Sequence, residues 1–189
     1  MAAAPRRSVG TTPSLGQTGT VVFLASDLML FAAFFAAYFF LRSVAATWPA
    51  TDAELDIIRT GAFTVVLLAS SATLQLGVGR FERAGDLASL RRWTAVTVLL
   101  GAVFLANQLV EYAQLDFGVE SHAYGSAYFG LTGLHAVHVA AGLGLLGYLA
   151  ARATPGRALG PETTTSLAYV WHLVDVVWIG VFVTVYLVR

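Results

Sequence analysis

The chain has 189 residues, of which 57% are hydrophobic and 12% are charged, and its mean hydropathy is +0.72. This composition is too apolar for a water-soluble domain and indicates a protein with several membrane spans. A formal net charge of zero gives no reason to expect a nucleic acid as partner, and the absence of cysteine excludes disulfides, thiolate metal sites, iron–sulfur clusters and covalently attached haem.

The N-terminal residues 1–17 are polar and are predicted to form a cytoplasmic tail. The apolar run that follows is too long for a signal peptide, so we expect it to be retained as the first membrane span.

Five apolar segments cover the rest of the chain, at about 18–42, 58–80, 92–114, 124–151 and 166–188. Each is long enough for a bilayer, which needs about 20 helical residues. The second segment is diluted by "SSATLQLGVG" (70–79), whose small and hydroxyl residues favour close helix packing over lipid contact. The sequence therefore predicts an all-α polytopic membrane protein, a five-helix bundle over residues 18–189.

The arginines predict the orientation of this bundle, because cytoplasmic loops of membrane proteins are rich in basic residues. Most of them lie before the first segment and in the loops after the second and fourth: Arg6, Arg7, Arg80, Arg83, Arg91, Arg92, Arg152 and Arg157. The two opposite loops are acidic, with Asp52, Glu54, Asp56, Asp116 and Glu120. We therefore expect a cytoplasmic N-terminus and an external C-terminus.

Several ionisable residues lie inside the predicted spans. At about 1.5 Å per helical residue, Asp27 lies about 14 Å from the cytoplasmic boundary, His172 about 10 Å, Asp175 about 15 Å and His138 about 18 Å. A second, more external set contains His135, Asn107, Gln108 and Glu111. Such groups cost several kcal/mol unless they are paired or face the bundle interior. The acids are therefore expected to be matched to the histidines, which places the first span beside the fourth or fifth.

Three interpretations of these residues remain open from the residues alone. A metal or haem site would use His135, His138, His172 and a carboxylate, since imidazole suits zinc, copper and iron. A proton path would use Asp27, His138 and Asp175. In the third interpretation the same residues are buried polar pairs that hold helices together and contact lipid headgroups, which the glycines and alanines of "FGLTGLHAVHVAAGLGLLGY" (129–148) favour.

Five stretches of the chain resemble a known family. They are "LASDLMLFAAFFAAYFFLR" (24–42), "LRRW" (90–93), "QLVEY" (108–112), "AYGSAYFGLTGLHAVHVAAG" (123–142) and "WHLVDVVWI" (171–179). In order and spacing they resemble subunit III of the haem–copper cytochrome c oxidases, in the shortened five-span form found in actinobacteria. The family commonly has glutamate where this chain has Asp27.

The resemblance implies a non-catalytic subunit of a respiratory terminal oxidase in the bacterial plasma membrane. It implies that this chain holds no cofactor and no metal, and that haem and copper lie in the partner subunits I and II, through which cytochrome c is reached. It also implies phospholipids held in a cleft against subunit I, and support for proton uptake by that subunit. The polar residues of the spans are then structural and lipid-facing groups: Asp27, Glu111, His135, His138, His172 and Asp175.

Two alternatives to this function stay open at the level of sequence. One keeps the fold and changes the partner, as in a quinol oxidase or a subunit-III-like protein beside a nitric oxide reductase. The other is an independent transporter or metal-dependent membrane enzyme that uses the buried histidines and aspartates.

Overall fold

The computed structural model describes residues 15–50, 53–156 and 159–188, and this part of the chain is helical, without a strand. The helices are α1 (Leu15–Val44), α2 (Ile57–Ala84), α3 (Leu87–Gln114), α4 (Ala123–Arg152) and α5 (Pro161–Phe182). A short π-helix, η1 (Val183–Leu187), continues α5. All five long helices are apolar and long enough to cross a membrane, with α5 and η1 forming one span, so the predicted five-helix bundle is confirmed.

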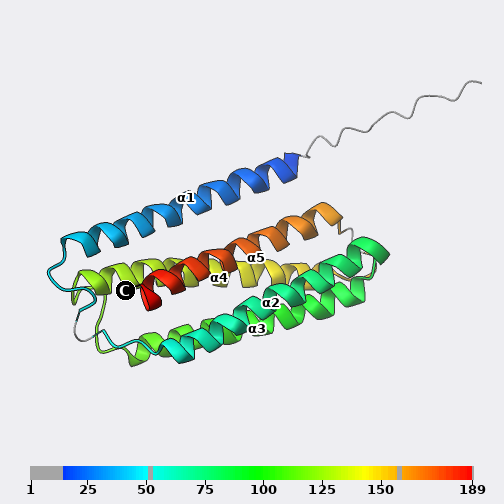
Figure 1. Cartoon of the computed structure of the whole chain (residues 1–189). Coiled ribbons are helices and arrows are strands. Elements are labelled where there is room, and N and C mark those ends of the chain that lie inside the picture. The colour runs from blue at the N-terminus through cyan, green and yellow to red at the C-terminus, as the bar shows by residue number, and fades with distance from the viewer. Residues whose placement is uncertain (1–14, 51–52, 157–158, 189) are drawn as a thin grey trace, which may run out of the picture.

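The ends of the helices follow local sequence signals. Gly85 ends α2 with φ of +67°, a conformation that glycine adopts without strain, and its N–H donates to the carbonyl of Phe81. Asp86 then caps α3 by accepting from the N–H of Ser89 at 2.9 Å. Because the turn is this short, α2 and α3 are antiparallel neighbours along their whole length, as Figure 1 shows.

Helix α5 begins earlier than the sequence analysis predicted, at Pro161 instead of residue 166. Proline at the first helical position loses no hydrogen bond, and Glu162 in the first turn favours the helix start electrostatically. Helix α1 likewise begins at Leu15, inside the predicted polar tail, while the rest of that tail, with Arg6 and Arg7, lies outside the described residues.

Helix α1 stands apart from α2 and α3 and packs mainly against α4 and α5, which lie between them (Figure 1). The expected position of the first span, beside the fourth or fifth, is therefore confirmed. In an apolar 18-residue stretch of α1, 6% of the residues are buried by the rest of the chain, compared with 50% in such a stretch of the span formed by α5 and η1. Much of α1 is thus free to contact lipid or another subunit.

Two tryptophans of α5 lie at the centre of the bundle formed by α2, α3, α4 and α5. Trp171 donates its indole N–H to Ser70 Oγ at 3.0 Å, and Trp178 donates to Thr64 Oγ1 at 2.9 Å, so both bind α2. A Cβ at Gly101 of α3 would lie 2.7 Å from the Trp171 ring, and one at Gly142 of α4 would lie 2.9 Å from it. Glycine at these two positions therefore makes room for the indole between α3 and α4.

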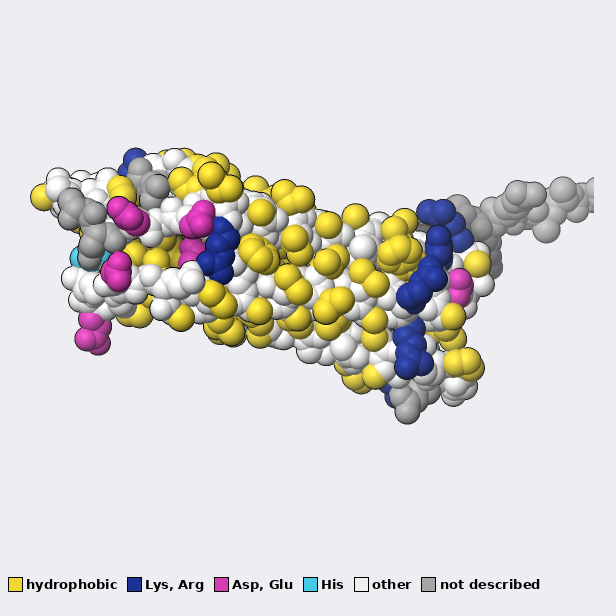
Figure 2. Space-filling model, turned by 90° about the horizontal axis from the view of Figure 1, so that it is seen from below, with side chains coloured by type: hydrophobic (Ala, Val, Ile, Leu, Met, Phe, Trp, Pro, Cys, Tyr) yellow, Lys and Arg dark blue, Asp and Glu magenta, His cyan; other side chains and the backbone are white. Residues whose placement is uncertain are grey.

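Charged residues gather at the two ends of the bundle (Figure 2). We call one the arginine end, which holds Arg80, Arg83, Arg91, Arg92 and Arg152, and the other the acidic end, which holds Glu54, Asp56, Asp116 and Glu120. An apolar belt separates them, as expected for a membrane protein. Arg157 and Asp52, which the sequence analysis also used, lie outside the described residues. The cytoplasmic location of the arginine end remains a prediction.

Candidate functional site

The polar residue of α1 that is buried in the span, Asp27, contacts α4 directly. Its Oδ1 lies 2.8 Å from Nε2 of His138, and its side chain is 9% exposed. The edge of the Phe31 ring packs on the imidazole with 5.0 Å between ring centroids. For Asp27 the expected match of an intramembrane acid with a histidine is thus present, with His138 as the partner, and it joins the exposed helix α1 to the rest of the bundle.

The second ring nitrogen of His138 restricts the protonation of this pair. His138 Nδ1 lies 2.8 Å from the carbonyl oxygen of Leu134, which can only accept, so Nδ1 carries a hydrogen. A hydrogen bond between Nε2 and Oδ1 of Asp27 then requires one further proton, carried by one of these two atoms, since two lone pairs at this distance repel each other. The pair is therefore either a carboxylic acid with neutral imidazole or a carboxylate with imidazolium, and it has no net charge in both cases.

Glu111 of α3 is buried among hydroxyl groups from three other helical segments. Its Oε1 accepts from Tyr186 of η1 at 2.8 Å and from Tyr128 of α4 at 3.2 Å, and its Oε2 accepts from Thr60 of α2 at 3.2 Å. The two tyrosine oxygens lie 3.1 Å apart. The expectation that the intramembrane acids pair with histidines is therefore wrong for Glu111, because hydroxyl donors satisfy it instead.

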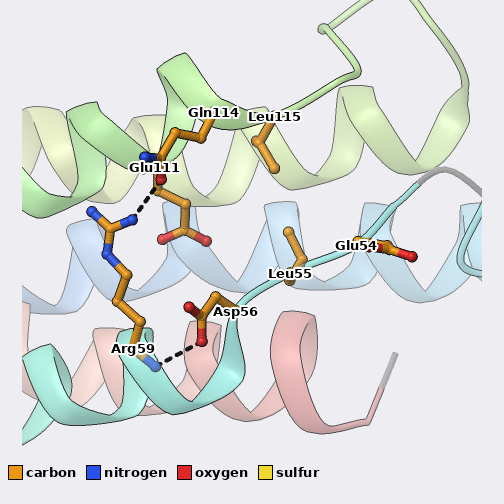
Figure 3. Close-up of a pocket in the computed structure, with 7 residues that line it drawn as sticks. All are labelled: Glu54, Leu55, Asp56, Arg59, Glu111, Gln114 and Leu115. Carbon is orange, nitrogen blue, oxygen red and sulfur yellow. Dashed lines mark hydrogen bonds between the residues drawn. The ribbon is translucent and has the colours of Figure 1, made fainter.

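A pocket of about 320 Å³ opens at the acidic end beside Glu111. Figure 3 shows Arg59 reaching from α2 across to Gln114 of α3, and the bond from Nη1 to Oε1 measures 2.5 Å. Arg59 Nε also donates to Asn107 Oδ1 at 2.7 Å, and Asp56 caps α2 by accepting from the Arg59 N–H. Arg59 therefore ties α2 to α3 at the mouth of the pocket.

The aspartate and histidine of α5 are linked through a serine of α2. Ser71 Oγ lies 2.8 Å from His172 Nδ1 and is also hydrogen-bonded to Asp175 Oδ2. His172 Nε2 lies 3.4 Å from Oε1 of Gln75, one turn further along α2. Asp175 is 3% exposed, and its Oδ1 has no hydrogen-bond partner among the described residues. Asp175 is thus matched to a histidine only through Ser71, and it does not join the Asp27–His138 pair, although the three residues are predicted to lie at similar depth.

His135 is fully buried and lies among aromatic rings. Its imidazole is 4.8 Å from the Trp178 ring and 6.0 Å from the Phe104 ring, measured between centroids. Neither of its nitrogens is hydrogen-bonded within the described part of the chain. It therefore does not join the other polar groups expected at its depth, Asn107, Gln108 and Glu111.

The predicted site residues do not converge on a single point. Within residues 15–50, 53–156 and 159–188, no three His, Cys, Asp or Glu side chains are placed to hold a metal ion. Sequence reasoning missed Ser71, Arg59 and the two tyrosines that bind Glu111. Hydroxyl groups in spans usually bind their own helix backbone, so only the three-dimensional structure identifies those that bridge helices.

Comparison with known proteins identifies the family. The sequence profile of "Cytochrome c oxidase subunit III" matches residues 12–188. The "Probable cytochrome c oxidase subunit 3" of Nocardia farcinica is 41% identical over 183 residues, which cover 94% of this chain and 90% of that protein.

Two further relatives carry the name "Cytochrome c oxidase subunit 3". The protein of Corynebacterium diphtheriae is 38% identical over all of this chain and 96% of its own length. The protein of a Synechocystis strain is 36% identical over 93% of this chain and 76% of its own. These names do not favour the quinol oxidase and nitric oxide reductase alternatives. The chain belongs to the cytochrome c oxidase subunit III family.

Proposed function

We propose that this chain packs against subunits I and II of a cytochrome c oxidase in a bacterial plasma membrane, holds phospholipid beside α1 and supports proton uptake by subunit I. Family membership makes it a multi-pass membrane subunit of a terminal oxidase and not itself a catalyst. Haem and copper belong to the partner subunits, and electrons from cytochrome c enter there.

One observation carries the lipid-holding part of this proposal: α1 is largely exposed and is joined to α4 by the buried Asp27–His138 pair. A lipid-facing helix ordinarily contains no acid, since an unpaired one costs several kcal/mol. The pair therefore fixes the position of α1 while leaving its outer surface for lipid or a neighbouring subunit.

A pocket between α1 and α5 at the arginine end adds support. It measures about 250 Å³, and polar side chains, one of them the acid Glu162, line it together with the apolar Val21: Gln17, Thr20, Glu162, Thr165, Ser166 and Tyr169. The hydroxyls of Thr20 and Thr165 already donate to Gly16 O and to Glu82 and Pro161 O, so toward a ligand their oxygens act as acceptors. A pocket that combines polar and apolar side chains at the end of the exposed helix α1 suits the part of a phospholipid where its polar head joins its apolar tails.

The proposal is tested by replacing Asp27 in the complete oxidase complex. Asp27→Asn removes the acid at constant size, and Asp27→Glu, which restores the residue common in the family, is the matched control. We expect Asp27→Asn to assemble with full haem content, because no cofactor ligand is lost. It should retain fewer phospholipids by mass spectrometry, and its oxygen consumption should decline during sustained turnover, whereas Asp27→Glu should behave as the wild type.

Two results would contradict this proposal. Loss of haem from the Asp27→Asn complex would give Asp27 a role in cofactor assembly. Unchanged lipid content and unchanged sustained turnover in both Asp27→Asn and Asp27→Leu would show that the pair has no part in lipid binding or proton supply.

A further inference from the structure

A line of hydrogen-bonded side chains connects the buried acid Asp175 to the surface of α2. It runs from Asp175 Oδ2 to Ser71 Oγ, from Ser71 Oγ to His172 Nδ1, and from His172 Nε2 to Gln75 Oε1. Its inner end is 3% exposed, whereas the contact between His172 and Gln75 lies at the exposed surface. A buried acid is therefore linked to the outside by groups that can both give and take a hydrogen.

The outer end of this line lies in a groove that leads to the arginine end. The groove measures about 600 Å³ and follows one face of α2 over nearly three turns: Ala72, Gln75, Leu76, Gly79, Arg80 and Arg83. Arginines near the end of a span extend toward the headgroups and draw water into the membrane around them. Arg83 and Arg80 line the outer part of this groove and Gln75 its inner part, so water that the arginines draw in would reach Gln75, the partner of His172.

The hydrogen-bond inventory of these groups allows two arrangements of the line. In the first, the Asp175 carboxylic acid donates to Ser71, Ser71 donates to His172 Nδ1, and His172 Nε2–H donates to Gln75 Oε1. All of these side chains are then uncharged. In the second, the Gln75 amide donates to Nε2, Nδ1–H donates to Ser71, and Ser71 donates to the Asp175 carboxylate.

The two arrangements differ by one proton. To pass from the first to the second, Nε2–H is released to a water in the groove, the Ser71 hydrogen moves to Nδ1, and the Asp175 hydrogen moves to Ser71 Oγ. The Gln75 side-chain amide rotates by half a turn, so that its NH₂ group replaces Oε1 at Nε2. His172 changes tautomer, Asp175 becomes a carboxylate and the groove water becomes hydronium. The reverse sequence returns the proton to Asp175.

We infer that Asp175 is a reversible proton-binding site in the membrane, which exchanges its proton with the arginine end through Ser71, His172 and the α2 groove. The unpartnered Oδ1 of Asp175 supports this, since a charged carboxylate with an unsatisfied oxygen is costly in an apolar interior, and a proton bound at Oδ2 removes the charge and so lowers that cost. The other buried acids are bonded elsewhere, Asp27 to His138 and Glu111 to hydroxyl groups. The inference goes beyond the proposed function and does not depend on it.

Infrared spectroscopy of the assembled oxidase in nanodiscs tests this inference. The C=O stretch of protonated Asp175 is assigned as the carboxylic acid band that disappears in Asp175→Asn. If that variant does not assemble, the band is assigned instead by its shift in Asp175→Glu. After a change from H₂O to D₂O we expect this band to shift as the proton exchanges. His172→Asn should slow the shift about a hundredfold, because the amide keeps the hydrogen bond to Ser71 but cannot carry a proton.

Two further variants complete the test. Ser71→Ala should also slow exchange, because it removes the link between Asp175 and His172. Ser43→Ala is the matched control: its hydroxyl binds a backbone carbonyl of α1 and is remote from the line, so exchange should not change. Exchange at the wild-type rate in both His172→Asn and Ser71→Ala would overturn the route. If Asp175→Asn removes no carboxylic acid band and Asp175→Glu shifts none, Asp175 holds no exchangeable proton and the inference fails.

Discussion

Helix α1 and the body formed by α2–α5 differ in how far the chain itself covers their surfaces. The buried residues of α1 are Asp27, Phe31 and Tyr38, a narrow stripe on one face. Helix α3, by contrast, buries residues along its whole length, among them Gly101, Phe104 and Glu111. The body is packed from within, whereas α1 requires lipid or another subunit to cover most of its surface.

The two regions also differ in what their buried polar groups do. In the body, indole and hydroxyl groups bond across helices around close-packed glycines, so polar bonds add to dense packing. On α1, the Asp27–His138 pair and the Tyr38 hydroxyl provide specific polar contacts, and the aromatic rings of Phe31 and Tyr38 are the buried apolar groups beside them. In a membrane, where lipid tails are as apolar as leucine, such polar bonds and close packing determine which helices associate.

Gly142→Leu is expected to have the largest effect, because it acts on the dense packing of the body. The new side chain would collide with the Trp171 ring, which already lies 2.9 Å from the position of a Cβ. We expect a loss of about 3 kcal/mol in the free energy of unfolding, at the upper end for overpacking. The measurement is SDS-induced unfolding in mixed micelles.

The same helix supplies the control for this prediction. A Cβ at Gly144 meets no atom within 4 Å, so Gly144→Leu should change stability by less than about 0.5 kcal/mol. Equal losses for the two variants would show that the cost arises from the helix backbone and not from the Trp171 contact.

Glu111→Leu, a second variant in the body, is expected to lower the free energy of unfolding by about 2 kcal/mol. It removes the acceptor of Tyr128, Tyr186 and Thr60, and a buried donor left unsatisfied costs about 1–3 kcal/mol. The two tyrosines can still bond each other, which limits the loss. The same unfolding assay measures it, and Glu111→Gln, which keeps an acceptor oxygen, should cost less. The exposed Glu120→Gln is the control, and a loss for it as large as that of Glu111→Leu would exclude a specific role of the hydroxyl cluster.

The polar contact that links α1 to the body is expected to appear as an energetic coupling between substitutions of Asp27 and His138. Either Asp27→Leu or His138→Leu leaves a polar partner unpaired in the membrane, whereas the double variant leaves none. A double-mutant cycle of unfolding free energies should therefore give a coupling of about 1 kcal/mol. Strictly additive losses would mean that the 2.8 Å contact contributes nothing to holding α1.

The sequence allowed the spans to be predicted well, because an apolar stretch of sufficient length has few alternatives to a membrane helix. Depth along a helix also places Asp27 in one group with His138 and His172, but it does not distinguish between these two histidines as its partner. Depth does not give direction around the helix axis, so it groups Glu111 with His135, which it does not bond, and it does not reveal that Ser71 lies between Asp175 and His172. Ser71 was regarded as a packing residue, and the π-helical turn at Val183–Leu187 has the same apolar composition as the α-helix before it.

The smallest expected effect comes from Tyr38, the second polar attachment of α1. Its hydroxyl donates to the carbonyl of Thr184 at 3.2 Å and accepts from the indole N–H of Trp48 at 3.2 Å. Tyr38→Phe keeps the ring, which packs edge-on against Trp48 with 5.1 Å between centroids, and removes only the oxygen. Polar bonds between membrane helices contribute about 0.6 kcal/mol on average, so we expect a loss of that size. Since α1 has few other attachments, the loss should appear as faster amide hydrogen exchange in α1, with exchange in the body unchanged.

The control is Tyr148→Phe, whose ring is 55% exposed on α4 and whose hydroxyl oxygen should not affect α1. If Tyr38→Phe accelerates exchange equally in α1 and the body, the two regions unfold as one unit, and the contrast between a loosely attached α1 and a self-packed body is wrong.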